Sequence, residues 1–388
     1  MRREAIAGGN FSGRSAMLRA FLQDAAEHAF FLGPYAEAAL SGLSSTVADE
    51  IAIYAHASGR RAFTPIDWAP FGARKPATLS GGEQVLLALH CFSRSAYKTI
   101  GIDTALEQLD AHNRASALDY LQSGDPFDVF LIDNRLDDVR WARHAATDTN
   151  PDYACDLAGV LGDLRPRQAP VIAVRTMDFS YPAGRPIFRN LDLALEPGRA
   201  YRLVGPNGAG KTTLFKLLVG VLNPSRGLIL LDGTRYEPRR SGNRVFALAT
   251  QNPDHQWCGA TLGEDIARRR RALATDPAIL PPTDALLASL AQKLGVRAGD
   301  QHLYELPLAA RKRLSWLWPF SGAMPWIMLD EPTIGQDRDT RIGLAAIVSR
   351  LCAIGYGVIL VTHDDDFAGR IPHQPLRIEG MRIREGSA

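Results

Sequence analysis

The segment from Gly205 to Thr213 reads GPNGAGKTT and constrains the fold more than any other part of the chain. It fits GxxxxGK[ST], a glycine-rich loop that joins a strand to a helix. An apolar strand pattern precedes it, and a helical pattern beginning LFKLL follows it. Such glycines let backbone N–H groups turn inward around phosphate oxygens, and the helix N-terminus adds positive potential. A chance glycine-rich turn is the alternative, and the strand and helix on either side argue against it.

The loop therefore predicts a nucleotide phosphate site. Lys211 is expected to reach the β- and γ-phosphates, and the Thr212 hydroxyl is expected to bind Mg²⁺. The residues of the loop that we expect to contact the nucleotide are Gly205, Asn207, Gly208, Gly210, Lys211, Thr212 and Thr213.

Two carboxylates follow a later apolar run, Trp326-Ile-Met-Leu, which describes a buried strand. We expect Asp330 to hold Mg²⁺ through water and Glu331 to orient and polarise the attacking water. Another apolar run, VILVT, ends at His363. A lone histidine at a strand end is often structural. Here it would lie at the same sheet edge as the γ-phosphate, which favours a catalytic role.

The order of these motifs resembles the ATP-binding cassette (ABC) ATPases over residues 171–385. The resemblance implies ATP as substrate and Mg²⁺ as cofactor. It also implies that Tyr181 stacks on adenine and that Gln251 contacts Mg²⁺ and the attacking water, in a loop that meets a membrane partner. QNPDHQ followed by TLGEDIA is similar to the energy-coupling-factor branch, which drives vitamin and metal-ion uptake.

One ABC element is missing from this half and present in the other. Where the family has LSGGQ, residues 306–310 read LPLAA, whereas residues 78–84 read TLSGGEQ. Leu79 and Leu306 lie 227 residues apart, and the same separation places Asp103 on Asp330 and Thr104 on Glu331. The repeated register predicts that the first half is a second domain of the same type.

The other landmarks of the first half are degenerate. GGNFSGRS, at residues 8–15, overlays the glycine-rich loop with Arg14 in place of Lys211. Asn134 falls on His363, and Tyr35 is placed at the position of Gln251. The first half is also shorter and has no obvious aromatic for adenine. We interpret it as a decayed domain that kept its signature.

The two halves are defective in complementary ways. ABC domains pair head to tail, with ATP between one domain's phosphate loop and the other's signature. The resemblance thus implies one complete composite site, in which Ser80, Gly81 and Gly82 face the phosphate loop of the second half. Glycines permit close approach of backbone N–H groups, and the helix start adds positive potential. A serine-capped glycine turn is the alternative for this stretch.

The expected fold class is α/β, with two ABC-type nucleotide-binding domains of P-loop NTPase sheet, flanking helices and a helical subdomain. We place a truncated, degenerate domain at 1–135, a linker at 136–170 and an intact domain at 171–388. The residues 306–317 are expected to form a helix with Trp316 and Trp318 in the core. Arg311, Lys312 and Arg313 are expected to be a surface cluster, and residues 364–366 the acidic first turn of a helix.

Charge and cysteine usage limit the cellular context. The chain has 388 residues, and 44 Lys and Arg against 42 Asp and Glu leave a net charge of +2, which argues against nucleic acid as a main partner. Its four cysteines are scattered singly, as suits core residues in a reducing cytosol, and no signal peptide or spanning segment is recognised. We expect a cytoplasmic protein, peripheral on the inner face of the membrane through integral membrane subunits.

The run of four arginines at 268–271 is open to two readings. It is either a solvated helix end or a contact with anionic lipid or an acidic partner surface. The candidate contact residues are Arg268, Arg269, Arg270 and Arg271.

The function that these motifs favour is an ATPase subunit powering a separate membrane transporter. The alternatives are a soluble ABC ATPase acting on the ribosome or DNA, and a slow ATP-dependent regulatory or structural switch. The chain could form its composite site alone or as a chain-swapped homodimer.

Overall fold

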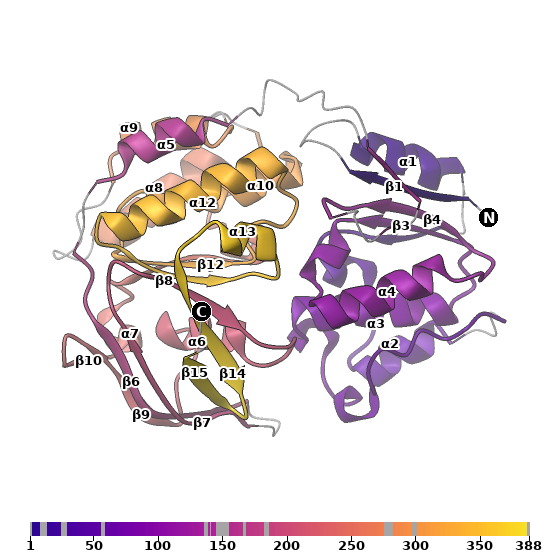
Figure 1. Ribbon diagram of the computed structural model, residues 1–388, viewed down its shortest axis with the longest axis horizontal. Helices are drawn as coiled ribbons and strands as arrows, with labels where there is room; N and C mark the ends of the chain where they lie inside the picture. The colour runs from indigo at the N-terminus through magenta and orange to yellow at the C-terminus, as the bar shows by residue number, and fades with distance from the viewer. Residues whose placement is uncertain are drawn as a thin grey trace. The chain divides into compact units, whose positions relative to one another are not determined.

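The computed structural model describes residues 2–7, 14–24, 29–55, 59–135, 139, 141–144, 155–165, 168–181, 186–274, 282–296 and 301–385. They form two compact units, shown in Figure 1. Unit 1 comprises Met1–Asn150 with Ile334–Arg338, and unit 2 comprises Pro151–Thr333 with Asp339–Ala388. The boundaries that the sequence predicts for the two domains and the linker stay a prediction.

Unit 2 is built on a six-stranded sheet whose strand order is β11-β12-β13-β8-β14-β15. All neighbours are parallel except the terminal hairpin of β14 and β15. Its central strands are continuous apolar runs because both faces are covered. The strands are β8 (Ala200–Val204), β11 (Phe246–Ala249), β12 (Trp326–Asp330), β13 (Gly357–Val361), β14 (His373–Glu379) and β15 (Arg382–Glu385).

A second, antiparallel sheet in unit 2 has the order β10-β9-β6-β7. Its strands are β6 (Ile172–Ser180), β7 (Pro186–Leu195), β9 (Arg226–Leu231) and β10 (Thr234–Tyr236). Apolar side chains of both sheets share one core with α6 (Lys211–Leu218), which contributes Leu214, Phe215 and Leu218. This core fixes the helix whose first residue is Lys211.

The remaining helices of unit 2 surround the sheet, and α8, α10 and α12 are seen across its other side in Figure 1. They are α5 (Leu157–Asp163), α7 (Pro238–Ser241), α8 (Leu262–Ala274), α9 (Asp284–Lys293), α10 (Leu308–Leu314), α11 (Leu317–Phe320), α12 (Arg338–Ala353) and α13 (Asp365–Gly369). Short 3₁₀ turns lie at η7 (Pro253–Gln256) and η8 (Leu303–Glu305).

Unit 1 has one sheet among its described residues, all of its neighbours parallel, in the order β2-β3-β4-β1-β5. Helix α1 packs on one face, with α3 and α4 on the other (Figure 1). The strands are β1 (Arg3–Ala7), β2 (Ala29–Leu32), β3 (Thr99–Asp103), β4 (Asp128–Ile132) and β5 (Ala142–His144). The helices are α1 (Arg14–Asp24), α2 (Val47–Ile53), α3 (Gly81–Arg94) and α4 (Ala111–Gln122), with 3₁₀ turns η2 (Ala36–Ala39), η3 (Ala69–Phe71), η4 (Pro76–Thr78) and η5 (Ala105–Gln108).

The five parallel strands of unit 1 each have a counterpart in the sheet of unit 2, and β15 has none among the described strands of unit 1. The order β2-β3-β4-β1-β5 in unit 1 repeats the order β11-β12-β13-β8-β14 in unit 2. The starts of β3 and β12, of α3 and α10, and of α4 and α12 are each 227 residues apart. The strand pairing corrects one assignment. Because Ala29 pairs with Thr99 as Phe246 pairs with Trp326, Pro34 corresponds to Gln251, and Tyr35 lies one residue beyond.

The expected helix over 306–317 is shorter and interrupted. It begins at Leu308, because Leu306 and Pro307 are extended, and α10 and α11 are separated by a turn at Ser315 and Trp316. Pro319 has no N–H for the Ser315 carbonyl and its ring crowds that carbonyl, which explains the break. Trp316 and Trp318 are buried, as expected.

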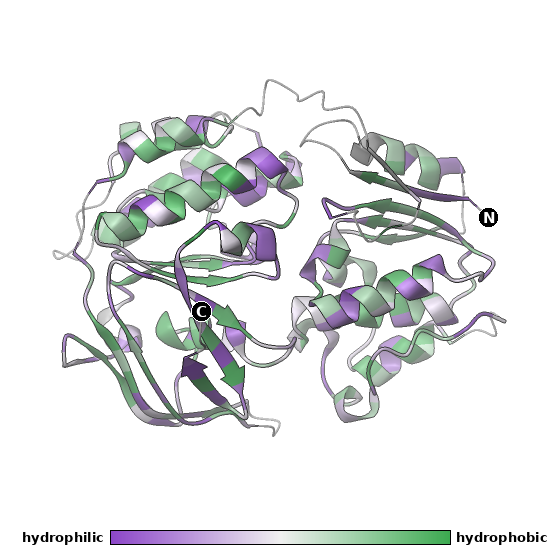
Figure 2. Cartoon of the chain, in the orientation of Figure 1, coloured by the Kyte–Doolittle hydropathy of each residue, from purple (hydrophilic) through white to green (hydrophobic). Residues whose placement is uncertain are grey.

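Most of the apolar residues from Leu314 to Leu329 are buried within unit 2, in α11 and β12. Figure 2 shows apolar colouring on the central strands of each unit's sheet. Within the described parts of the chain, no helix combines the length and apolar character that crossing a bilayer requires.

The segment expected to be a linker contributes to both units. β5 adds a parallel strand beside β1 in the sheet of unit 1, and α5 contacts α9 in unit 2. All four cysteines are free; Cys91 is buried as expected for a core residue, whereas Cys258 is exposed.

Candidate functional site

The glycine-rich loop connects β8 to α6 and closes on itself through Lys211. The Lys211 ammonium donates to the carbonyls of Gly205 (2.7 Å) and Pro206 (3.2 Å). Gly208 and Gly210 have φ of 75° and 106°, and a Cβ on Gly210 would lie 2.5 Å from Ile187. A side chain at position 210 would therefore be strained and would also clash.

The loop fits a phosphate group. The Asn207 side-chain nitrogen is buried without a hydrogen-bond partner among the described residues. The first turn of α6 presents its N–H groups at the same place, and Lys211 supplies a positive charge. An unpaired buried donor beside a helix N-terminus and an ammonium is what an anionic ligand would satisfy.

Thr212 and Asp330 form the oxygen pair that the sequence predicts for Mg²⁺. The Thr212 hydroxyl donates to Asp330 Oδ2 at 3.1 Å. Burial raises the pKa of Asp330, and the nearby Lys312 ammonium and the Thr212 hydrogen bond oppose that rise. Hydroxyl and carboxylate oxygens suit Mg²⁺, which takes few protein ligands and completes its shell with water and phosphate.

Glu331 and His363 lie together at the ends of β12 and β13. The Glu331 carboxylate accepts the backbone N–H of His363 at 3.2 Å, and its Oε1 lies 3.6 Å from His363 Nε2. Glu331 has φ of 45°, held by its own N–H donating to the Val361 carbonyl at 2.9 Å. A non-glycine residue in this region is strained, and such strain concentrates at functional sites.

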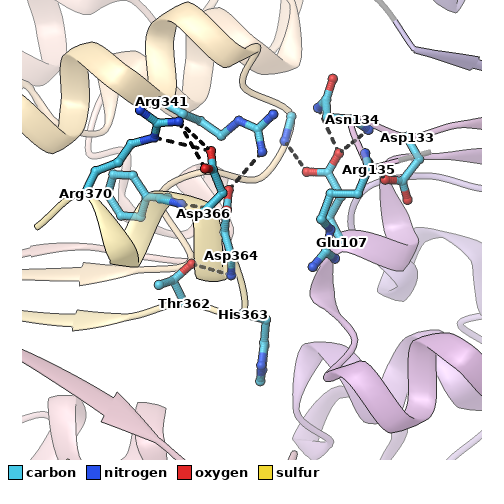
Figure 3. Close-up of polar contacts among 12 residues, drawn as sticks. Glu107, Asp133, Asn134, Arg135, Arg341, Thr362, His363, Asp364, Asp366 and Arg370 are labelled. Atoms are coloured by element: carbon cyan, nitrogen blue, oxygen red, sulfur yellow. Dashed lines mark hydrogen bonds and ion pairs between the residues drawn. The ribbon is translucent and has the colours of Figure 1, made fainter. Parts of the chain in front are cut away.

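The acidic turn after His363 is structural, as expected. Asp364 caps α13 by accepting from the Phe367 N–H, and it pairs with Arg341 at 2.9 Å. Asp366 pairs with Arg370. Figure 3 shows these aspartates facing the two arginines, with the His363 ring pointing away from them.

Tyr181 lies next to the first turn of α6. Its hydroxyl is 3.1 Å from the Thr213 hydroxyl, and its ring packs edge-on against Phe179. The residue is 40% exposed, so a planar ligand could reach it.

The expected surface cluster Arg311, Lys312 and Arg313 is wrong. Lys312 is 0% and Arg313 2% exposed. The Lys312 ammonium donates to the carbonyls of Thr250 (2.9 Å), Gln251 (2.9 Å) and Asp330 (3.1 Å). Sequence reasoning missed this residue. Helical spacing from the buried Ala309 and Trp316, three and four residues away, would have placed it on the inward face.

In unit 1 the signature stretch starts helix α3. Ser80 is the N-cap: its hydroxyl accepts from the Glu83 N–H at 3.4 Å, and the Glu83 carboxylate accepts from the Ser80 N–H at 2.7 Å. This capping box is the structural role that the sequence left as an alternative. Gly81 and Gly82 form the first turn, so their N–H groups belong to the helix N-terminus.

The unit 1 residues matching the catalytic positions lack the same chemistry. Thr104 has the same strained backbone as Glu331. Its φ is 55°, and its N–H donates to the Ile132 carbonyl. Asn134, at the position of His363, donates its backbone and side-chain N–H groups to Glu107 (3.1 and 2.8 Å). Neither residue can act as a general base at neutral pH.

Glu107 is a buried carboxylate that the sequence reasoning missed. Figure 3 shows Asn134 beside Glu107. Glu107 also accepts the N–H of Gly335 at 3.0 Å, and Gly335 belongs to the stretch grouped with unit 1. Burial and the nearby Asp133 carboxylate raise the pKa of Glu107 to about 7.

The four arginines lie on α8, and three of them are paired within the chain. Arg268 pairs with Glu264, Arg269 with Asp265 and Arg270 with Asp284. This pairing favours the reading of a helix surface.

The degenerate loop of unit 1 is mostly outside the described residues. Residues 8–13 are not described, and of Arg14 only the backbone is described, as the first residue of α1.

Comparisons with known proteins give the family of this chain. The family described as ABC transporter matches residues 188–334. The energy-coupling factor transporter ATP-binding protein EcfA of Methanothermobacter thermautotrophicus is 30% identical over 56% of this chain and 71% of its own length. A protein of Streptomyces coelicolor named as an ABC transporter ATP-binding protein is 34% identical, over 56% and 77%.

One solved structure is similar over almost the whole chain. The model titled ribosome-bound archaeal Pelota and ABCE1 has a TM-score of 0.67, with 14% identity over 99% of this chain and 74% of that one. This likeness shows that the α/β fold extends over both units.

Proposed function

Because the chain belongs to the ABC transporter ATP-binding proteins and is an ATPase of that type, we propose that it powers transport through a separate membrane protein. The observation that carries the proposal is the grouping of Lys211, Thr212, Asp330, Glu331 and His363 at one end of the parallel sheet of unit 2. The work would take place at the inner face of the membrane. Similarity to EcfA and the stretch QNPDHQ support an energy-coupling-factor type of transporter.

In the proposed mechanism, residues of this chain bind and position ATP, and one of them, Glu331, accepts a proton. Lys211 and the N–H groups of the loop hold the phosphates, and Tyr181 packs on the adenine. Thr212 and Asp330, with Gln251, would hold Mg²⁺, which neutralises charge on the phosphates when bound. Glu331 orients the attacking water, and His363 fixes the Glu331 carboxylate and faces the γ-phosphate.

We propose that only one composite site hydrolyses ATP. The first unit would supply Ser80, Gly81 and Gly82, whose helix N-terminus stabilises charge on the transferred phosphoryl group. The matching strand orders and equal spacings of the two sheets support a tandem origin. The threonine at position 104 and the asparagine at position 134 support decay of the first half's own site.

The one-site proposal predicts unequal effects at the two loops. Lys211→Ala should abolish detectable turnover, because it removes the phosphate-binding charge of the complete site. Arg14→Ala should leave the ATPase rate within about twofold of wild type, as for a residue outside the reacting site. Steady-state phosphate release measures both. If Arg14→Ala is as inactive as Lys211→Ala, the one-site proposal is wrong.

The transport proposal is tested by purification from detergent-solubilised membranes. Tagged Glu331→Gln protein with ATP should co-purify with integral membrane proteins, and Lys211→Ala protein should retain less of them. Recovery of ribosomal proteins instead would favour the soluble alternative, for which the fold likeness to the ribosome-bound complex is the only support. Analytical ultracentrifugation tests how the composite site forms. A dimer that appears only with ATP would favour a chain-swapped homodimer over a site formed within one chain.

A further inference from the structure

Helix α10 stands where the signature helix of this family would be, yet it carries LPLAA at its start. We propose that Lys312, on the buried side of α10, is a positioning residue that holds the Gln251 loop against the end of β12 and thereby sets the geometry for ATP hydrolysis. This inference rests on the proposed function of the unit 2 site.

The first support is the hydrogen bonding of the Lys312 ammonium. An ammonium has three donors, and here each meets a backbone carbonyl, of Thr250, Gln251 and Asp330. Thr250 and Gln251 directly follow β11, and Asp330 ends β12. The ammonium therefore joins the two adjacent strand ends that carry proposed Mg²⁺ ligands.

The second support is that neighbouring residues of the same helix hold the same loop. Arg311 pairs with Asp254 at 2.6 Å. The Gln256 side chain donates to the Ser315 carbonyl at 3.2 Å and accepts the Thr250 N–H at 3.1 Å. Three contacts thus fasten residues 250–256 to α10 and its C-cap residue, and of these three the Lys312 contact also reaches β12.

The third support is the cost of burying this charge. Lys312 is 0% exposed, and burial lowers its pKa to about 8, although the Asp330 and Glu331 carboxylates favour the charged form. An apolar residue would avoid this cost in an ordinary core. Unit 1 does have an apolar residue there: Val85, 227 residues earlier, is buried in α3. The lysine is thus confined to the half with the intact phosphate loop.

Lys312→Met and Lys312→Gln in the full chain test the proposal. Methionine keeps the length but removes all three donors, whereas glutamine keeps two. We expect kcat to fall about 100-fold for methionine and about 10-fold for glutamine, because small misplacements of reacting groups have effects of this size. The KM for ATP should change less than about threefold, since the phosphate loop is untouched.

Two further readouts separate positioning from general stability. The Mg²⁺ concentration for half-maximal activity should rise in both variants, and hydrogen exchange should accelerate in residues 250–256 but not in β8. Lys293→Met is the matched control, because it removes another half-buried ammonium of unit 2, which donates to the Gly159 carbonyl and to Asp163, and leaves the contacts of residues 250–256 unchanged. Its kcat should stay within about threefold of wild type.

The proposal is overturned if folded Lys312→Met has wild-type kcat and Mg²⁺ dependence. If methionine prevents folding, the glutamine variant decides, and a wild-type kcat there overturns the proposal as well. Lys211→Ala in the same assay distinguishes failure of the proposed ATPase site from failure of the positioning role of Lys312. An inactive Lys211→Ala with fully active Lys312 variants rejects only the positioning role, whereas an active Lys211→Ala rejects the site and the role together.

Discussion

Replacing Glu331 with glutamine is expected to lower ATP turnover by about 10³-fold while ATP binding persists. We propose this carboxylate as the proton-accepting group of the site; it accepts the His363 N–H, and its backbone has a strained φ directly after β12. Glutamine has nearly the same shape and keeps an oxygen to accept that N–H. The phosphate loop and the Thr212–Asp330 pair are unaffected, so the nucleotide should still bind.

Single-turnover hydrolysis and equilibrium binding of radiolabelled ATP measure the two quantities. Thr104→Gln is the matched control, because Thr104 shares the backbone geometry of Glu331 in unit 1. It should change turnover less than about twofold, as expected for a residue outside the reacting site. A Glu331→Gln protein that hydrolyses ATP at a near wild-type rate would show that another group activates the water.

The elements that the sequence predicted best are those encoded by contiguous residues. The glycine-rich loop needs the strand before it and the helix after it, and all three are adjacent in the chain. The strands ending at Asp330 and at Val361, just before His363, are uninterrupted apolar runs, as strands covered on both faces must be. Parallel pairing of those strands then brings the Glu331 and His363 positions together at one sheet edge.

The parts that were missed depend on groups distant in sequence. The basic neighbours of Lys312 in sequence predict a surface position, yet its ammonium donates to the carbonyls of residues 250, 251 and 330. Glu107 can be buried at tolerable cost because N–H groups of Asn134 and Gly335, distant in sequence, donate to its carboxylate. The sequence predicts the position of Tyr35 one residue off, because the loop after β2 has no apolar alternation to fix its register.

The second large effect on ATP turnover is expected at the signature stretch of unit 1, and not at LPLAA, the matching stretch of unit 2. Gly81→Asp should reduce turnover by about 10²–10³-fold, because a carboxylate at the start of α3 would repel the γ-phosphate and cover the N–H donors there. Position 81 is preferable to 82 for this test, since Gly82 is buried and Gly81 is half-buried. ATP binding to the phosphate loop should fall only modestly.

Leu308→Asp is the matched control, because Leu308 is the first residue of α10 and is also half-buried. An aspartate in the first turn of either helix interacts favourably with the helix dipole, so neither change should unfold its unit. Since LPLAA would face only the degenerate loop of the first half, Leu308→Asp should leave the steady-state ATPase rate within about twofold of wild type. Equal losses in the two variants would mean that both signature positions serve hydrolysis, and a larger loss at Leu308 would assign the working site to the opposite pair.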